Sequence, residues 1–178
     1  MNLKNIYIVL LIFISGITFG QDAGINSQSI KANFSTKNIQ AYQENSQNKL
    51  DEFYEYLSLY STENDENLKS QIRENIFLMV EIGIEIPDFT EPNLVKIDLA
   101  KFLFKIENQS ILFKIKSDQN PTEAGFNQWT NPYVLSVSRN GKTSEFEVEQ
   151  IIYFEPKEKK FGSKTKTVWE IKLGDVQQ

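Results

Sequence analysis

The dipeptide Asn140-Gly141 stands between two segments in which apolar and polar residues alternate, and it fixes how these segments pair. A two-residue hairpin loop of this kind needs positive φ at both central residues, which Asn and Gly tolerate best. A turn at this point places Leu135 opposite Phe146 and Tyr133 opposite Val148. Because apolar residues then meet on one face, the sequence predicts an antiparallel hairpin in this register.

The second predicted hairpin follows directly and returns through residues 156–163. If Glu155 pairs with Lys164, apolar residues of the two strands meet on one face, while on the other face Glu147 meets Lys172 and Ile151 meets Val168. This register places the amide of Gln150 opposite Trp169, among apolar neighbours. The chain therefore has a polar side chain on the face that we expect to be buried.

A third hairpin is predicted upstream, because the apolar residues alternate with a period of two from Leu94 onward. A turn at residues 107–110 would set Ile106 opposite Ile111. The alternation changes parity near Ala100-Lys101, so we expect a β-bulge there that bends the sheet.

The first half of the chain has helical periodicity instead. Apolar residues at steps of three and four predict an amphipathic helix over residues 37–60. Thr62 and Asp65 resemble a capping box that starts a second helix, which ends near Ile82, although residues 81–86 alternate and could equally form a short strand. Helices followed by strands predict an α+β fold, with two helices on a curved antiparallel sheet of about five strands.

The chain begins with a short segment that carries Lys4, followed by an apolar run from Ile6 to Ile14 and by small residues, which are the parts of a cleavable secretory signal. The apolar run is shorter than the about 20 residues that a membrane span needs. We therefore expect a signal peptide over residues 1–20, a flexible leader over 21–36, one domain over 37–174 and a tail over 175–178. The signal would export the protein to the periplasm or beyond the cell, and its cleavage after Gly20 would leave no stable membrane anchor.

Composition excludes several classes of site. The chain has neither cysteine nor histidine, so disulfides, lipidation at cysteine, Ser-His-Asp and Cys-His catalysis, and His/Cys zinc sites cannot form. Its formal net charge of −5 argues against a nucleic-acid partner, because phosphate binding is driven by Lys and Arg. We assign no catalytic residue, no metal ligand and no cofactor.

Gln150 is the most informative single residue. A buried amide without partners costs about 1–3 kcal/mol, so it should be hydrogen-bonded or face a cavity. The functional hypothesis is a ligand pocket formed by Gln150, Trp169, Tyr133 and Thr167 beneath the helices. The structural alternative, which we favour, is that Gln150 bonds a helix terminus or lies where the strand has left the core.

The other face of the same strand carries alternating glutamates. A straight strand face does not converge on a cation as a calcium loop does. We expect a solvated face on which lysines of the next strand balance the acids. The glutamates are Glu145, Glu147 and Glu149, and the lysines are Lys164, Lys166 and Lys172.

Helices followed by long, partly bulged antiparallel strands resemble the cone-shaped fold of the nuclear transport factor 2-like family, over about residues 37–174. Cystatin-like folds are the nearest alternative. The signal ending and the abundance of Asn, Lys and Ile resemble exported proteins of Bacteroidetes. The resemblance implies a small apolar ligand, a proton-transfer enzyme or a dimerisation module. In such an enzyme Asp98 could lie in the cone as a base, but with the bulge it would face water.

We interpret the chain as an exported non-enzymatic binding or assembly module. The alternative is a small apolar ligand-binding protein, or a carboxylate- and tyrosine-dependent isomerase or dehydratase. The sequence leaves open three kinds of partner, which are a small apolar ligand, another protein, and a second copy of the chain in a homodimer.

Overall fold

The structure is a computed structural model that describes residues 34–125 and 127–178, so the predicted signal peptide lies outside the described residues. The helices in the described part are α3 (Thr36–Thr62), α4 (Glu66–Met79) and α5 (Leu99–Ile106). The strands are β1 (Glu85–Pro87), β2 (Lys96–Asp98), β3 (Leu112–Asp118), β4 (Thr122–Gly125), β5 (Gln128–Arg139), β6 (Lys142–Phe161) and β7 (Lys164–Gln177).

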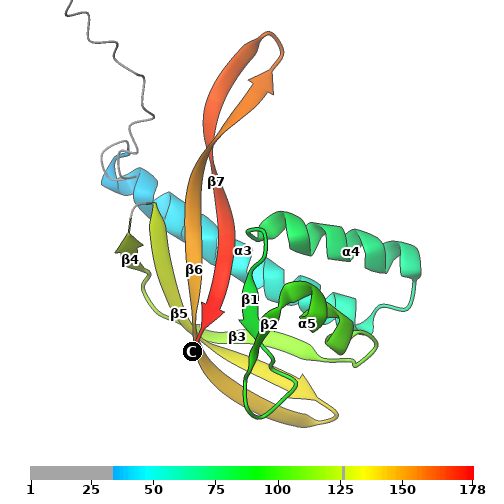
Figure 1. The fold of residues 1–178 in the computed structure, drawn as a ribbon. Helices are drawn as coiled ribbons and strands as arrows, with labels where there is room; N and C mark the ends of the chain where they lie inside the picture. Colours follow the sequence, from blue (N-terminus) through cyan, green and yellow to red (C-terminus); the bar gives the residue numbers. More distant parts are fainter. Residues whose placement is uncertain (1–33, 126) are drawn as a thin grey trace, which may run out of the picture.

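The main sheet is antiparallel and has the strand order β3-β5-β6-β7, with β4 paired to β5. A separate two-stranded sheet joins β1 and β2. The long helix α3 lies along the main sheet and contacts β3 and β7, while α4 and α5 pack at one end (Figure 1). The predicted α+β class is therefore confirmed, with three helices in the described residues where the sequence predicted two.

The hairpin at Asn140-Gly141 has the predicted register. Both turn residues have positive φ, at 52° and 74°, as this turn requires. Tyr133 pairs with Val148 and Leu135 with Phe146. Burial alternates along the paired parts of both strands, so their apolar side chains face the core.

The predicted register between β6 and β7 is wrong. The turn lies at Gly162, where φ is 63°, and Phe161 pairs with Lys164, so β6 continues through Pro156. Proline is tolerated because β6 pairs with β5 only up to Tyr153 and has one open edge beyond it. The shift is an even number of residues, so each side chain keeps its predicted face but gains a different partner.

The third predicted hairpin is also wrong, because its first strand is helix α5. The apolar residues Leu99, Phe102 and Ile106 recur at steps of three and four and are buried on one helix face. Phe104, which a strand would bury beside them, is 79% exposed. The apolar residues of this segment fit both the period of two of a strand and the period of 3.6 of a helix. The segment forms a helix because its buried face packs against α3.

Two boundaries differ from prediction. Thr62 is the last residue of α3, and Asp65 itself caps α4 by accepting hydrogen bonds from the backbone of Asn67 and Leu68. At the other end of the chain, β7 continues through the fully buried Val176, so the sheet extends past the predicted end of the domain. No helix in the described ranges is long and apolar enough to cross a membrane.

Candidate functional site

Gln150 lies at the centre of a buried polar network between the sheet and α3. Its side chain is 0% exposed, and its Nε2 donates to the backbone carbonyl of Gly174. The Tyr133 hydroxyl donates to Gln150 Oε1 at 3.5 Å, and the hydroxyls of Tyr133 and Tyr54 lie 2.6 Å apart. The network therefore connects β7, β6, β5 and α3.

A β-bulge explains why the sequence has an amide here. Gln150 pairs with Val176 and Ile152 with Leu173, so two residues of β7 lie opposite one residue of β6. A bulge leaves backbone groups without ladder partners. The Gln150 amide satisfies the Gly174 carbonyl at this point. The Gln150 side chain therefore hydrogen-bonds a bulged strand. It does not bond a helix terminus, and it does not lie where the strand has left the core, which were the two predicted environments.

Burial also keeps the two tyrosines neutral. Desolvation raises the pKa of Tyr54 and of Tyr133 well above the ordinary value for tyrosine. Both hydroxyls are hydrogen-bonded and sealed from solvent. They are suited to hold the strands and the helix together, and a solvent-borne proton has no direct route to them.

The structure brings together only two of the four residues of the predicted pocket. Tyr133 and Gln150 are in contact, but Trp169 pairs with Pro156 and Thr167 with Glu158, in the distal part of the β6–β7 hairpin. The six-residue difference in register separates them. Side chains of α3 cover the face that carries Gln150, since Tyr54 contacts Tyr133 and Tyr42 packs edge-on against Phe154.

Asp98 has a structural position. Its Oδ1 accepts hydrogen bonds from the backbone N–H groups of Ala100 at 2.8 Å and Lys101 at 3.3 Å, so it is the N-cap of α5. This differs from both predicted positions, since it neither lines a cone nor lies beside a bulge. The carboxylate that a proton-transfer site would need is thus engaged in capping the helix.

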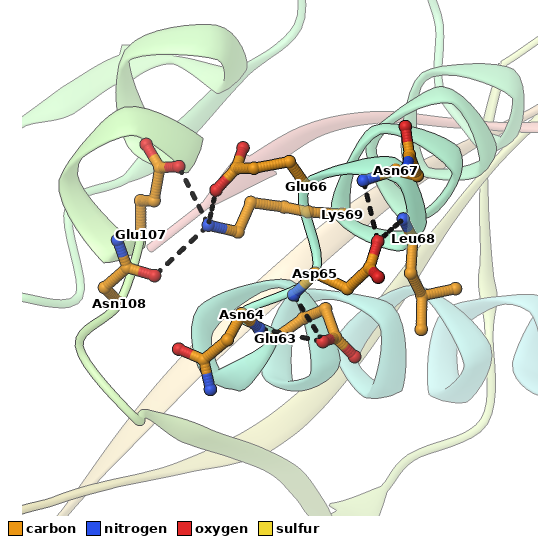
Figure 2. A network of polar contacts seen from close by, with 9 residues as sticks. All are labelled: Glu63, Asn64, Asp65, Glu66, Asn67, Leu68, Lys69, Glu107 and Asn108. Atoms are coloured by element: carbon orange, nitrogen blue, oxygen red, sulfur yellow. Dashed lines mark hydrogen bonds and ion pairs between the residues drawn. The ribbon is translucent and has the colours of Figure 1, made fainter.

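A second polar cluster, around Lys69, was not predicted from the sequence (Figure 2). Lys69 is 4% exposed, and its Nζ lies 3.1 Å from Glu66, 3.2 Å from Glu107 and 3.2 Å from Asn108. Burial opposes the charge, but the two carboxylates outweigh it and raise the pKa of Lys69. An ammonium has three protons and three oxygens accept them here, so the cluster links α4 to the end of α5.

One sequence signal could have revealed this cluster. Lys69 lies three residues before Ile72 and seven before Ile76, so it falls on the apolar stripe of the second helix. A lysine on a buried stripe requires acidic partners. The distant partner, Glu107, becomes its neighbour only through the packing of α5.

The distal β6–β7 hairpin projects away from the helices (Figure 1). We call residues 157–167 the arm. Five lysines and one glutamate give the arm a formal charge of +4 in a chain of net charge −5. All of its described strand residues are exposed, and Phe161 near the tip is 54% exposed. The lysines are Lys157, Lys159, Lys160, Lys164 and Lys166.

Four of these lysines lie on one face. Cross-strand partners share a face in an antiparallel ladder. Lys159 pairs with Lys166, and Phe161 pairs with Lys164. Lys157 lies two residues before Lys159 and therefore on the same face. This is also the outer face of β6, opposite the buried network.

The glutamates on the outer face of β6 are not balanced as predicted. Glu145 contacts Lys116, but within the described ranges no lysine or arginine nitrogen lies within 4.0 Å of Glu147 or Glu149. Lys172 instead donates to the carbonyl of Leu78 at the end of α4. The register that puts lysines in the arm therefore leaves an acidic strip at one end of the sheet and a basic face at the other.

Known proteins do not identify the site. No protein-family model matches the chain, and the comparison with curated proteins finds no relative.

Proposed function

We propose that the chain is an exported, non-enzymatic binding or assembly module, which contacts its partner through the outer face of the arm. The long helix against a twisted antiparallel sheet supports a cone-like fold of the nuclear transport factor 2-like or cystatin-like kind. The observation that carries the proposal is the arm: an exposed two-stranded hairpin with four lysines on one face and Phe161 near its tip.

The arm is unfavourable for the stability of the isolated molecule. A two-stranded hairpin without a third strand or a packed face is marginally stable in water. Like charges directly opposite each other destabilise a ladder further, and Lys159 lies opposite Lys166. A partner that neutralises these charges and covers Phe161 would offset both costs.

The chemistry of the arm favours carboxylates as its target. Arginine forms bidentate contacts with phosphate, but the cations of the arm are all lysines. Lysine ammonium groups form ion pairs with Asp and Glu side chains, and an exposed aromatic residue supplies apolar contact area. We therefore propose an acidic protein surface as the partner.

The alternative function, a small-molecule pocket around Gln150, has less support. Tyr133 and Gly174 hold the amide, and α3 covers the surrounding face. A ligand there would have to displace the side chains of α3.

Poly-L-glutamate is a suitable probe for an acidic protein surface. We expect the purified protein to bind the immobilised polymer at low salt, and the triple variant K159Q/K164Q/K166Q to lose at least about tenfold in affinity, because each exposed charge contributes up to about 1 kcal/mol. The matched control is K96Q/K101Q/K142Q, which removes the same charge from exposed positions outside the arm. Equal losses in the two triple variants would overturn the proposal.

Shortening the arm provides a second readout. Because Lys157 pairs with Val168, an Asn-Gly turn can join them in place of residues 158–167. We expect this variant to lose binding to the polymer while its melting temperature stays close to that of the parent protein, since the removed residues are exposed. Retained binding would show that another surface is responsible.

A further inference from the structure

The outer face of β6 changes from acidic to basic along its length. In the middle of β6 the even-numbered residues from Val148 to Phe154 are buried, so the odd-numbered residues face outward. We call these outward residues the β6 strip. In chain order they are Glu145, Glu147, Glu149, Ile151, Tyr153, Glu155, Lys157, Lys159 and Phe161.

We infer that the acidic protein surface is the β6 strip of a second copy of this chain, packed antiparallel in a two-fold symmetric dimer. The inference rests on the proposed function, because it uses the arm as the contact surface. It goes further by naming the partner and the residues that the arm meets.

The strip is complementary to itself when it is reversed. With the two-fold axis at Tyr153, Glu149 of one copy lies opposite Lys157 of the second copy, and Glu147 lies opposite Lys159. Each contact occurs twice, as in any two-fold interface. Tyr153, half-buried in the single chain, meets its own copy at the axis, and the half-buried Ile151 beside it lies opposite Glu155 of the second copy. Apolar contact at the axis with ion pairs on both sides of it is the usual arrangement of a protein interface.

One molecule cannot make these contacts internally. Glu149 and Lys157 are eight residues apart on a single strand, which is about 26 Å at 3.3 Å per residue. In the single chain, Lys157 and Lys159 share the carboxylate of Glu170 at 2.8 Å and 4.0 Å, while Glu147 and Glu149 have no cationic partner within 4.0 Å among the described residues. The acidic half of the strip is thus available to a second chain.

An open groove lies beside the acidic half of the strip. Val134 lies opposite Glu147 and Pro132 opposite Glu149 on the neighbouring strand β5. These residues line a groove of about 560 Å³ with Gln119. Pro132 and Val134 give the groove apolar surface beside the carboxylates of Glu147 and Glu149. Lysine stems can pack along such apolar surface while their ammonium groups reach the carboxylates.

Charge reversal tests this geometry directly. We expect the wild-type protein to be a dimer by size-exclusion chromatography with light scattering, and to dissociate as salt screens the exposed charges. E147K and K159E should each raise the dimer dissociation constant at least about tenfold, because two attractive contacts become repulsive. The double variant E147K/K159E should restore the dimer, since a strip with both charges exchanged is again complementary to itself.

The matched control is E55K, which reverses an exposed glutamate on α3 without altering the strip. It should leave the dimer intact. Circular dichroism and melting temperature establish that each variant is folded, and the salt dependence of the wild-type dimer provides a test that needs no variant.

Three results would overturn the inference. They are a wild-type protein that stays monomeric at its highest soluble concentration, a dimer that E147K weakens no more than E55K does, and a double variant that is no more dimeric than either single one. If a monomeric wild type still binds poly-L-glutamate through the arm, the proposed function stands and its partner is a different acidic protein. If the arm variants keep their affinity for the polymer, the proposed function itself fails.

Discussion

Replacing Gln150 with methionine should destabilise the protein without leaving a cavity. Methionine has nearly the same length as glutamine but donates no hydrogen bond, so the Gly174 carbonyl at the bulge loses its side-chain partner while it stays buried. A buried unsatisfied polar group costs about 1–3 kcal/mol. The lost contact from Tyr133 adds little, because at 3.5 Å it is at the limit of a hydrogen bond. The free energy of unfolding should therefore fall by about 1–3 kcal/mol.

Thermal unfolding followed by circular dichroism measures this effect. For a domain of this size, 1 kcal/mol corresponds to about 2–4 °C, so the melting temperature should fall by roughly 2–12 °C. The control is Gln71→Met on the exposed surface of α4, which makes the same chemical change without a buried partner. If the two variants melt at the same temperature, the Gln150 amide is not what satisfies the bulge, and the argument for a sealed structural network fails.

Two further predictions concern the structural carboxylates. Asp98→Ala should lower the free energy of unfolding by about 0.5–2 kcal/mol, because α5 loses its N-cap; a urea midpoint unchanged from the parent would contradict the assigned role. At Asp88, burial opposes the charge, but the hydrogen bonds from Lys105 at 2.5 Å and from Thr90 outweigh it and lower the pKa. A lowered pKa contributes stability above the unfolded value of about 4, and this stability is lost as pH falls further. Urea unfolding between about pH 5 and pH 2 should therefore be less pH-dependent in Asp88→Asn, and identical slopes would show that Asp88 is not the linked group.

The accuracy of the sequence-based predictions depended on how local the controlling interactions are. Asn140-Gly141 defines its hairpin within four residues, because positive φ is a property of the turn itself. The β6–β7 register has no such anchor, since a six-residue shift preserves every face. The correct register is the one that pairs Ile152 with Leu173, two residues that are fully buried.

Helix α5 was missed for a related reason. Its apolar residues fit two periods, and only packing against α3 selects the helical one. Asp98 at its start is a normal helix cap, and this signal was present in the sequence. The candidate pocket did not assemble because Trp169 and Thr167 were linked to Gln150 only through the wrong β6–β7 register.

The sequence by itself determined the class of the fold, the positions of the first two helices and the first strand pairing, because periodicity and turn chemistry act between residues that are close in the chain. It also excluded chemistry that needs histidine or cysteine. Tertiary structure alone decided which charges find partners. Lys69 becomes buried among oxygens from α4 and the end of α5, whereas the lysines of the arm and the glutamates of β6 are held apart along one strand. Charge compensation acts between atoms that are close in space, and that closeness is set only when the register and the packing are complete.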